Sequence, residues 1–167
     1  MTAHWDSKQL SRLLLTQFAP EMSKLASNKA PKSDIDILIT FDQYGISSHA
    51  NHRALYVGAK AFLQSMMRRH SGWEPPIKMY TLTTTNILRK YMSIFDSIAS
   101  VLDVIFSRKE EGEYPSPLFL VSTPLEYWKA QTAMTSGHKS QMVWFRWGWI
   151  TMSRYMIINY LQREKVR

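Results

Sequence analysis

The chain has 167 residues, enough for one domain with a substantial hydrophobic core. It contains no cysteine, which excludes disulfide bonds and thiolate metal sites. Its formal net charge of +8 at pH 7 predicts a negatively charged partner, such as an anionic lipid or a phosphorylated substrate. Nucleic acid also meets the charge argument, but the basic residues are scattered and no nucleic-acid-binding motif accompanies them, so we expect no nucleic-acid partner.

Neither a secretory signal nor a membrane-spanning helix is expected. The polar residues from Asp6 onward interrupt the apolar core that a signal peptide needs. The most apolar stretch, residues 142–161, contains Arg146, Arg154 and Asn159. Because a centrally placed arginine costs about 2.5–3.5 kcal/mol in a spanning helix, this stretch is suited to lie on a membrane rather than cross it.

Hydrophobic periodicity predicts a helix, a strand and a second helix in the first seventy residues. Asp6 or Ser7 can cap a helix that reaches Phe18, and Pro20 disturbs its continuation. Residues 35–41 lack polar alternation, which predicts a strand that is buried on both faces of a parallel sheet. A second helix is expected over residues 51–70.

The second half of the chain repeats the alternation of strand and helix. Strands are expected at residues 77–82 and 118–123. Thr84 or Thr85 can cap the helix after the first of these strands, and Pro124 suits the first turn of the helix after the other.

This alternation predicts an α/β fold, an open parallel sheet with flanking helices of the Rossmann-like kind. A charged stretch with prolines at residues 107–117 predicts a long loop before the last strand. Three strands are few for a sheet covered on both faces, so we expect residues 1–167 to form a single, incomplete domain whose amino-terminal part is missing.

Two histidines three residues apart, His49 and His52, follow the first predicted strand and precede the second helix. The carboxyl ends of sheet strands carry the chemistry of α/β enzymes, and helix amino termini stabilise anions. Histidine is the commonest metal ligand and the usual proton shuttle near neutral pH. Two solvated loop histidines remain the alternative.

Four segments carry a resemblance to a known family: residues 39–56, 85–93, 138–146 and 153–159. In order and spacing they resemble the N-acetylglucosaminyl-phosphatidylinositol de-N-acetylases, which belong to the LmbE-like zinc deacetylases. The resemblance implies an LmbE-like fold and a zinc-dependent amide hydrolase. Its substrate would be the glycolipid N-acetylglucosaminyl-phosphatidylinositol, deacetylated during GPI-anchor biosynthesis at the cytoplasmic face of the endoplasmic reticulum membrane.

The resemblance also implies roles for individual residues. His52 matches the histidine that binds zinc, and His49 matches the catalytic histidine that stabilises the oxyanion, as an imidazolium in one reading. Asp42 matches an aspartate with a structural or supporting hydrogen-bonding role. His138 matches a family histidine, with a packed histidine that caps the last helix as the alternative. Ser48 stands where the family usually has glycine.

The family's His-Pro-Asp-Asp-Glu motif, which supplies two further zinc ligands and the general base, does not occur in the 167 residues. A catalytic zinc needs about three protein ligands and an open position for water. The resemblance therefore implies an incomplete ligand set, and we expect this chain alone to be inactive. The alternative is a catalytically silent truncated form that acts as a membrane- or partner-binding domain.

The aromatic carboxyl-terminal part has two interpretations. If residues 139–154 form one helix, Lys139 and Arg146 share a face and Arg154 lies about 80° further round. Tryptophan and arginine on such a helix suit a membrane surface made of lipid headgroups. An aromatic helix that closes the hydrophobic core accounts for the same residues.

Overall fold

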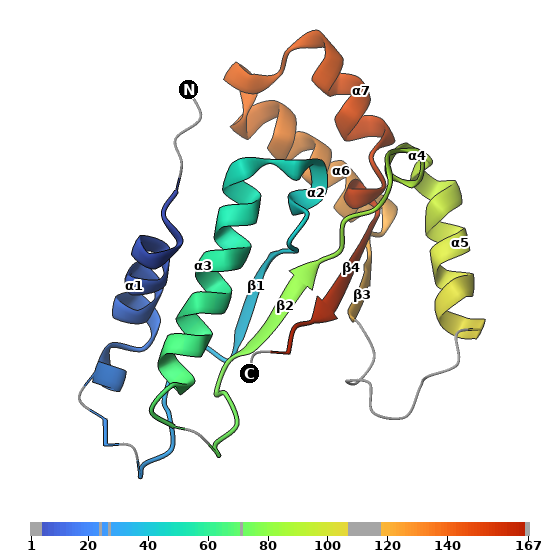
Figure 1. The fold of residues 1–167 in the computed structure, drawn as a ribbon. Coiled ribbons are helices and arrows are strands. Elements are labelled where there is room, and N and C mark those ends of the chain that lie inside the picture. Colours follow the sequence, from blue (N-terminus) through green and yellow to red (C-terminus); the bar gives the residue numbers. More distant parts are fainter. Residues whose placement is uncertain (1–4, 24, 27, 71, 107–117, 166–167) are drawn as a thin grey trace. The chain divides into compact units, whose positions relative to one another are not determined.

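A computed structural model describes residues 5–23, 25–26, 28–70, 72–106 and 118–165 (Figure 1). The chain divides into two compact units, one from Met1–Thr84 with Leu161–Arg167 and the other from Thr85–Tyr160. The loop predicted at residues 107–117 lies outside the described residues. That residues 1–167 form a single, incomplete domain stays a prediction.

The first unit holds two long helices and the parallel part of the sheet. Its elements are α1 (Ser7–Phe18), the 3₁₀ turn η1 (Pro20–Ser23), β1 (Ile37–Phe41), the short turn α2 (Gly45–Ser48), α3 (Ala50–Met67), β2 (Lys78–Leu82) and the end of β4 (Ile158–Arg163). The predicted amino-terminal helix is confirmed, with Asp6 accepting a hydrogen bond from the amide of Lys8 at 3.1 Å. Pro20 opens a 3₁₀ turn instead of a further helical turn.

The hydrophobic core of the first unit lies between α1, α3 and one face of the sheet. Phe62 and Leu63 of α3 are fully buried and belong to one cluster with Met79 of β2. Helices α1 and α3 run side by side in Figure 1. They approach closely at Gly58, where an added Cβ would lie 2.7 Å from the Cβ of Leu10. The second predicted helix is thus confirmed and anchored by its apolar face.

Strand β1 departs from its prediction, because only one of its faces is covered by the described residues. The side chains of Ile37 and Ile39 are 52% and 58% exposed, whereas Leu38 packs against the core cluster. Strand β1 stands at the end of the strand order β1-β2-β4-β3. An end strand with helices on one face exposes alternate residues, so an apolar run alone could not distinguish it from a strand buried on both faces.

The α/β class is confirmed, and the sheet is mixed. Strands β1 and β2 are parallel, in register from Ile37 opposite Lys78 to Phe41 opposite Leu82. Strand β4 runs antiparallel to β2, with Leu82 opposite Leu161. Strand β4 was not predicted from the sequence, because its short run of alternating residues follows an aromatic segment with helical spacing.

The second unit contains mainly short helices. Its elements are α4 (Ile87–Tyr91), α5 (Ser93–Phe106), β3 (Leu118–Val121), α6 (Pro124–Thr132), the π-helical turn η2 (Ala133–Gly137), the 3₁₀ turn η3 (Lys139–Gln141), α7 (Trp144–Met152), the 3₁₀ turn η4 (Arg154–Met156) and the start of β4. Pro124 stands in the first turn of α6, as predicted, and Thr123 forms a capping box with Glu126. Asn86 caps α4, so the predicted cap at Thr84 or Thr85 is wrong.

The single helix considered for residues 139–154 does not form. Helix α7 ends at Met152, Ser153 is extended and Arg154 begins a separate 3₁₀ turn, where it is buried. Most of the aromatic side chains of α7 are exposed, Trp144 at 86%, so α7 does not close the core. Within the part of the chain that the structure describes, no helix combines the length and apolar character that a membrane crossing requires.

Candidate functional site

His52 lies in the first turn of α3, against the end of β1. Its ring stacks on Phe41 with centroids 3.9 Å apart and planes 10° from parallel. Its Nδ1 atom lies 3.0 Å from the carbonyl oxygen of Gly45. Because a carbonyl oxygen only accepts hydrogen bonds, Nδ1 carries the proton and Nε2 of the neutral ring keeps its lone pair. A metal-binding histidine is typically held in this way, through its other nitrogen.

His49 is the residue that caps α3, and its side chain is exposed. Its Nδ1 atom accepts a hydrogen bond from the backbone amide of Asn51 at 3.3 Å. An amide N–H only donates, so in the neutral ring the proton lies on Nε2. The two histidine rings lie 4.8 Å apart between centroids, with a tilt of 35°. His49 can therefore offer an N–H donor beside His52 without becoming an imidazolium.

Asp42 organises the loop that leads to both histidines. Its Oδ1 atom accepts hydrogen bonds from the amides of Tyr44 and Gly45, at 3.0 and 2.9 Å. The hydroxyl of Thr84 donates to Oδ1 and its amide to Oδ2, both at 2.6 Å. The Thr84 hydroxyl oxygen in turn accepts from the amide of Ile46 at 2.9 Å. One carboxylate thus connects the loop after β1 to Thr84, two residues after the end of β2.

Asp42 contacts the loop backbone that in turn contacts His52. Asp42 holds the amide of Gly45, and the carbonyl of the same glycine holds His52. Gly45 therefore connects Asp42 to the ring of His52. Neither Thr84 nor Gly45 was predicted from the sequence as a site residue, because Thr84 has the local pattern of a helix cap. The available signal was its place two residues after β2, the strand that neighbours β1.

The loop backbone is strained. Gly45, Ile46 and Ser48 have φ values of 64°, 64° and 58°, in the left-handed region. That conformation costs an L-residue about 1–2 kcal/mol, so the hydrogen bonds that the loop amides donate to Asp42 and Thr84 must hold it. Ser48 adopts the positive φ at the position where the resembled family usually has glycine. A non-glycine residue at this φ carries an energetic cost that glycine would not.

The described residues supply one fitting metal ligand and no complete site. His52 fits through its lone pair on Nε2, whereas the oxygens of Asp42 already accept four hydrogen bonds. In the ranges that the structure describes, no group of three or more His, Cys, Asp or Glu side chains is arranged to hold a metal ion. His138 belongs to the second unit, and its exposure argues against a packed histidine.

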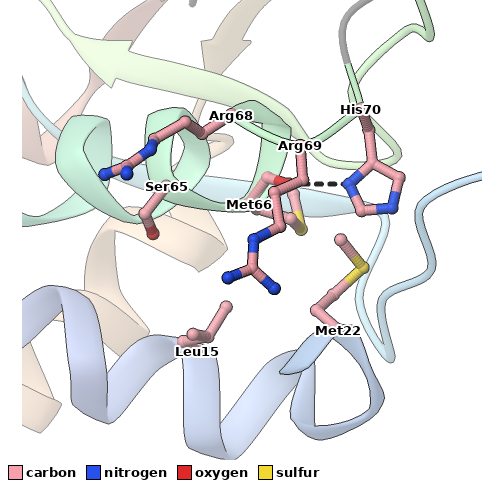
Figure 2. Close-up of a pocket in the computed structure, with 7 residues that line it drawn as sticks. All are labelled: Leu15, Met22, Ser65, Met66, Arg68, Arg69 and His70. Atoms are coloured by element: carbon pink, nitrogen blue, oxygen red, sulfur yellow. Dashed lines mark hydrogen bonds between the residues drawn. The ribbon is translucent and has the colours of Figure 1, made fainter. Parts of the chain in front are cut away.

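An open hollow in the first unit adjoins the histidine loop. It has a volume of about 720 Å³, and Gln43, Ala50 and Arg53 are among its lining residues. A second pocket, of about 380 Å³, lies at the far end of α3 (Figure 2). There Nδ1 of the buried His70 lies 3.3 Å from the carbonyl oxygen of Met66. This second pocket contains none of the loop residues and is separate from the candidate site.

Comparisons with known proteins agree with the resemblance. No family model matches the chain, and no solved structure matches it. A protein of Arthroderma benhamiae named N-acetylglucosaminyl-phosphatidylinositol de-N-acetylase is 42% identical, over 99% of this chain and 57% of that protein. Proteins with the same name are 32% identical in Saccharomyces cerevisiae, over 83% of this chain and 52% of that protein, and 36% identical in Bos taurus, over 76% and 44%.

The chain spans about half the length of the curated relatives that it matches. The similarity to the Arthroderma benhamiae protein extends through nearly all 167 residues of this chain. The chain belongs to the N-acetylglucosaminyl-phosphatidylinositol de-N-acetylase family.

Proposed function

We propose that this protein takes part in hydrolysing the N-acetyl group of N-acetylglucosaminyl-phosphatidylinositol, a step of GPI-anchor biosynthesis. The names of the relatives support the substrate and the reaction. The observation that carries the proposal for this chain is the pair of histidines at the start of α3. Backbone hydrogen bonds favour a free Nε2 lone pair on His52 and an Nε2–H donor on His49.

The chemistry divides between these two rings. In amide hydrolysis the oxygen of water bonds to the acetyl carbon, the carbon–nitrogen bond breaks, the amine takes a proton and acetate leaves. His49 would donate a hydrogen bond from its Nε2–H to the oxyanion that develops on the carbonyl oxygen, where a preorganised donor is most effective. His52 would hold a zinc ion, which when bound supplies an acidified water and polarises the carbonyl.

The proposed zinc site requires further ligands besides His52, because about three protein ligands are needed. The His-Pro-Asp-Asp-Glu motif of the family is absent from the 167 residues. We therefore propose that this chain alone is inactive.

The proposed location is the cytoplasmic face of the endoplasmic reticulum membrane. A lipid substrate, as the relatives' names indicate, is reached from a membrane surface. The exposed tryptophans Trp144, Trp147 and Trp149 of α7 support contact with that surface, since tryptophan is enriched at lipid interfaces.

A chimera tests the proposed function. The part of the Saccharomyces cerevisiae relative that aligns with this chain is replaced by the chain, and acetate release from N-acetylglucosaminyl-phosphatidylinositol is measured together with bound zinc. We expect an active chimera. His52→Ala should remove both zinc and activity, whereas His49→Ala should keep zinc and lower the rate by about 10²–10³-fold.

Lys8→Ala, an exposed change on α1, is the matched control and should leave both measurements unchanged. A folded chimera that binds zinc and releases no acetate would refute the proposed function. Loss of zinc in His49→Ala would refute the division of roles between the two histidines.

A further inference from the structure

Arg53 stands between the histidine pair and the open hollow of the first unit. Its backbone amide donates to the carbonyl oxygen of His49 at 3.1 Å, and side chains four residues apart on a helix are neighbours. An added Cβ at Gly45 would lie 3.0 Å from the Cβ of His52 and 3.1 Å from the Cγ of Arg53. Arg53 therefore flanks both histidines, and its side chain also lines the hollow.

The hollow opens between the amino-terminal ends of α1 and α3, which run side by side (Figure 1). Its volume of about 720 Å³ lies within the range of about 300–1,000 Å³ that small-molecule sites occupy. Three small side chains of α3 form an apolar part of its lining, Ala50, Ala54 and Val57. The size and place of the hollow suit one part of a ligand whose other part reaches the histidines.

The guanidinium of Arg53 carries a charge that the described residues do not neutralise. The side chain is exposed, and in the part of the chain that the structure describes no ion pair or hydrogen bond engages it. Asp6 also lines the hollow, but its Oδ1 atom accepts from the amide of Lys8 at 3.1 Å. It caps α1, and the positive end of that helix dipole offsets its charge. Arg53 is therefore free to bind an anion.

Two aromatic side chains, Trp5 and Tyr56, line the same hollow. The hydroxyl of Tyr56 donates to Glu164 at 2.9 Å, and Lys60 donates to the same carboxylate oxygen at 2.9 Å, so the end of the tyrosine is held in place. Trp5 is 43% exposed, and Gln43 adds an amide that can donate and accept. Aromatic rings with a few polar groups are typical of a small-molecule site, and they suit a ring with apolar faces and hydroxyl groups at its edge.

The substrate of the proposed function combines such a ring with an anion. In N-acetylglucosaminyl-phosphatidylinositol the acetylated sugar is joined to an inositol ring, and the inositol carries a phosphodiester. When the acetyl group lies at His49 and His52, the inositol and its phosphate must lie beside the two histidines. A guanidinium binds phosphate oxygens through two parallel charge-assisted hydrogen bonds, and Arg53 is placed to supply them.

We propose that Arg53 binds the phosphodiester of the substrate and that the hollow receives its inositol ring. The proposal rests on the proposed function for the identity of the ligand. It makes Arg53 a substrate-binding residue, which selects phosphorylated inositol over free inositol.

Glycerophosphoinositol, the headgroup without acyl chains or N-acetylglucosamine, is the probe for this site. The full chain is titrated with it, and NMR follows the phosphorus resonance of the ligand and the Nε–H resonances of isotope-labelled arginines. We expect saturable binding that shifts the Nε–H resonance of Arg53, which is assigned by its loss in Arg53→Gln. Free myo-inositol, which lacks the phosphate, should leave that resonance in place.

Substitutions at position 53 measure the contribution of the guanidinium. Arg53→Gln should weaken the binding of glycerophosphoinositol at least about tenfold, because charge-assisted hydrogen bonds are lost. Arg53→Lys keeps the charge without the two parallel donors, so its affinity should fall between those of Arg53→Gln and the wild type. Arg68→Gln removes the same charge from an exposed position at the far end of α3, about 22 Å away by the rise of the helix, and should bind as the wild type does.

Equal weakening by Arg53→Gln and Arg68→Gln would overturn the proposal, because the net charge of the chain would then attract the ligand. Absence of saturable binding, or an Arg53 resonance that stays in place at saturation, would overturn it directly. So would an equal affinity for inorganic phosphate, since the hollow would then hold no inositol. Circular dichroism checks that the variants fold.

The titration involves neither zinc nor turnover. A failed titration therefore leaves the chimera experiment unaffected, and an inactive chimera leaves the titration unaffected.

Discussion

The Nδ1 atom of His52 lies 3.0 Å from the carbonyl oxygen of Gly45, seven residues earlier in the chain. This single contact selects the tautomer of the histidine. Gly45 is itself held through its amide by Asp42, so the orientation of the ring depends on the backbone of a glycine in the left-handed region. A side chain and a loop conformation are thus coupled, and changes in either should affect both.

Gly45→Ala should disturb His52 directly. A Cβ at position 45 would lie 3.0 Å from the Cβ of His52 and 3.2 Å from the amide nitrogen of Arg53, at a φ of +64°. We expect a loss of about 1–2 kcal/mol in unfolding free energy, measured by urea denaturation. Gly148→Ala is the control, because nothing lies within 4 Å of an added Cβ there. Equal stability of the Gly45→Ala variant and the wild type would contradict the strained loop.

Thr84→Val should loosen the loop after β1. The substitution keeps the shape of the side chain but removes the hydroxyl that donates to Asp42 and accepts from Ile46. We expect a cost of about 1–3 kcal/mol in unfolding free energy, since partly buried partners lose their hydrogen bonds. Thr84→Ser retains the hydroxyl and should recover most of the loss. Nitrogen chemical shifts of His52 should report a mixed tautomer in Thr84→Val alone.

Asp96→Asn should destabilise the second unit strongly. Burial lowers the pKa of Arg154, the nearby charge of Asp96 opposes that effect, and Arg89 adds to the lowering. Without the carboxylate, two guanidiniums face each other around a neutral amide, one of them buried. The expected loss of unfolding free energy is about 3–5 kcal/mol. Arg146→Gln, which removes only hydrogen bonds to the exposed Gln141, should cost less than about 1 kcal/mol by the same measurement.

The cluster of Tyr56, Lys60 and Glu164 should make stability fall at high pH. A hydrogen bond to Glu164 raises the pKa of Lys60 above 10.5, against the opposing effect of burial. Burial, followed by the hydrogen bond to Glu164, raises the pKa of Tyr56 above 10.0. Both raised values favour the protonated groups in the folded protein. Their contribution is therefore complete below the ordinary values and is lost as pH rises through the raised ones.

Urea denaturation between neutral pH and the alkaline range measures this loss. Glu164→Gln removes the main cause of the raised pKa of Lys60 and part of the cause of the raised pKa of Tyr56, so the variant should show a smaller decline above about pH 10. At neutral pH the substitution should lower the free energy of unfolding by about 0.5 kcal/mol, as expected for a partly exposed ion pair. An identical alkaline decline in the variant and the wild type would assign the effect to other groups.

The purified 167-residue chain should hold no stoichiometric zinc, because His52 is one ligand where about three are needed. Elemental analysis after dialysis against trace metal checks this expectation. One tightly bound zinc per chain would show that residues outside the family's ligand pattern complete the zinc site. His52→Ala would then identify whether this histidine takes part.

The local elements and the location of the candidate site could be predicted from residues that are close in the chain. The Asp6 cap, the helical spacing of α1 and α3, and the apolar run of β1 are signals between residues close in the chain. The strand and the helix that such signals predict lie on either side of the loop with His49 and His52, so the place of both histidines at the start of α3 could be predicted. Their ligand and oxyanion roles came from the family resemblance and stay predictions.

Tertiary structure decided the contacts between distant residues. Thr84 is 42 residues from Asp42, and a threonine before a helical segment has the local pattern of a cap, so its engagement with the carboxylate could not be predicted. Arg154 can be buried because its guanidinium pairs with the carboxylate of Asp96 and donates to the hydroxyl of Ser100, 54 residues away. The same pairing buries the polar side of α5 and leaves Phe95, Ile98 and Ile105 exposed. The helical period identifies the apolar face of α5, but the ion pair of Asp96 with Arg154 decides that this face is exposed.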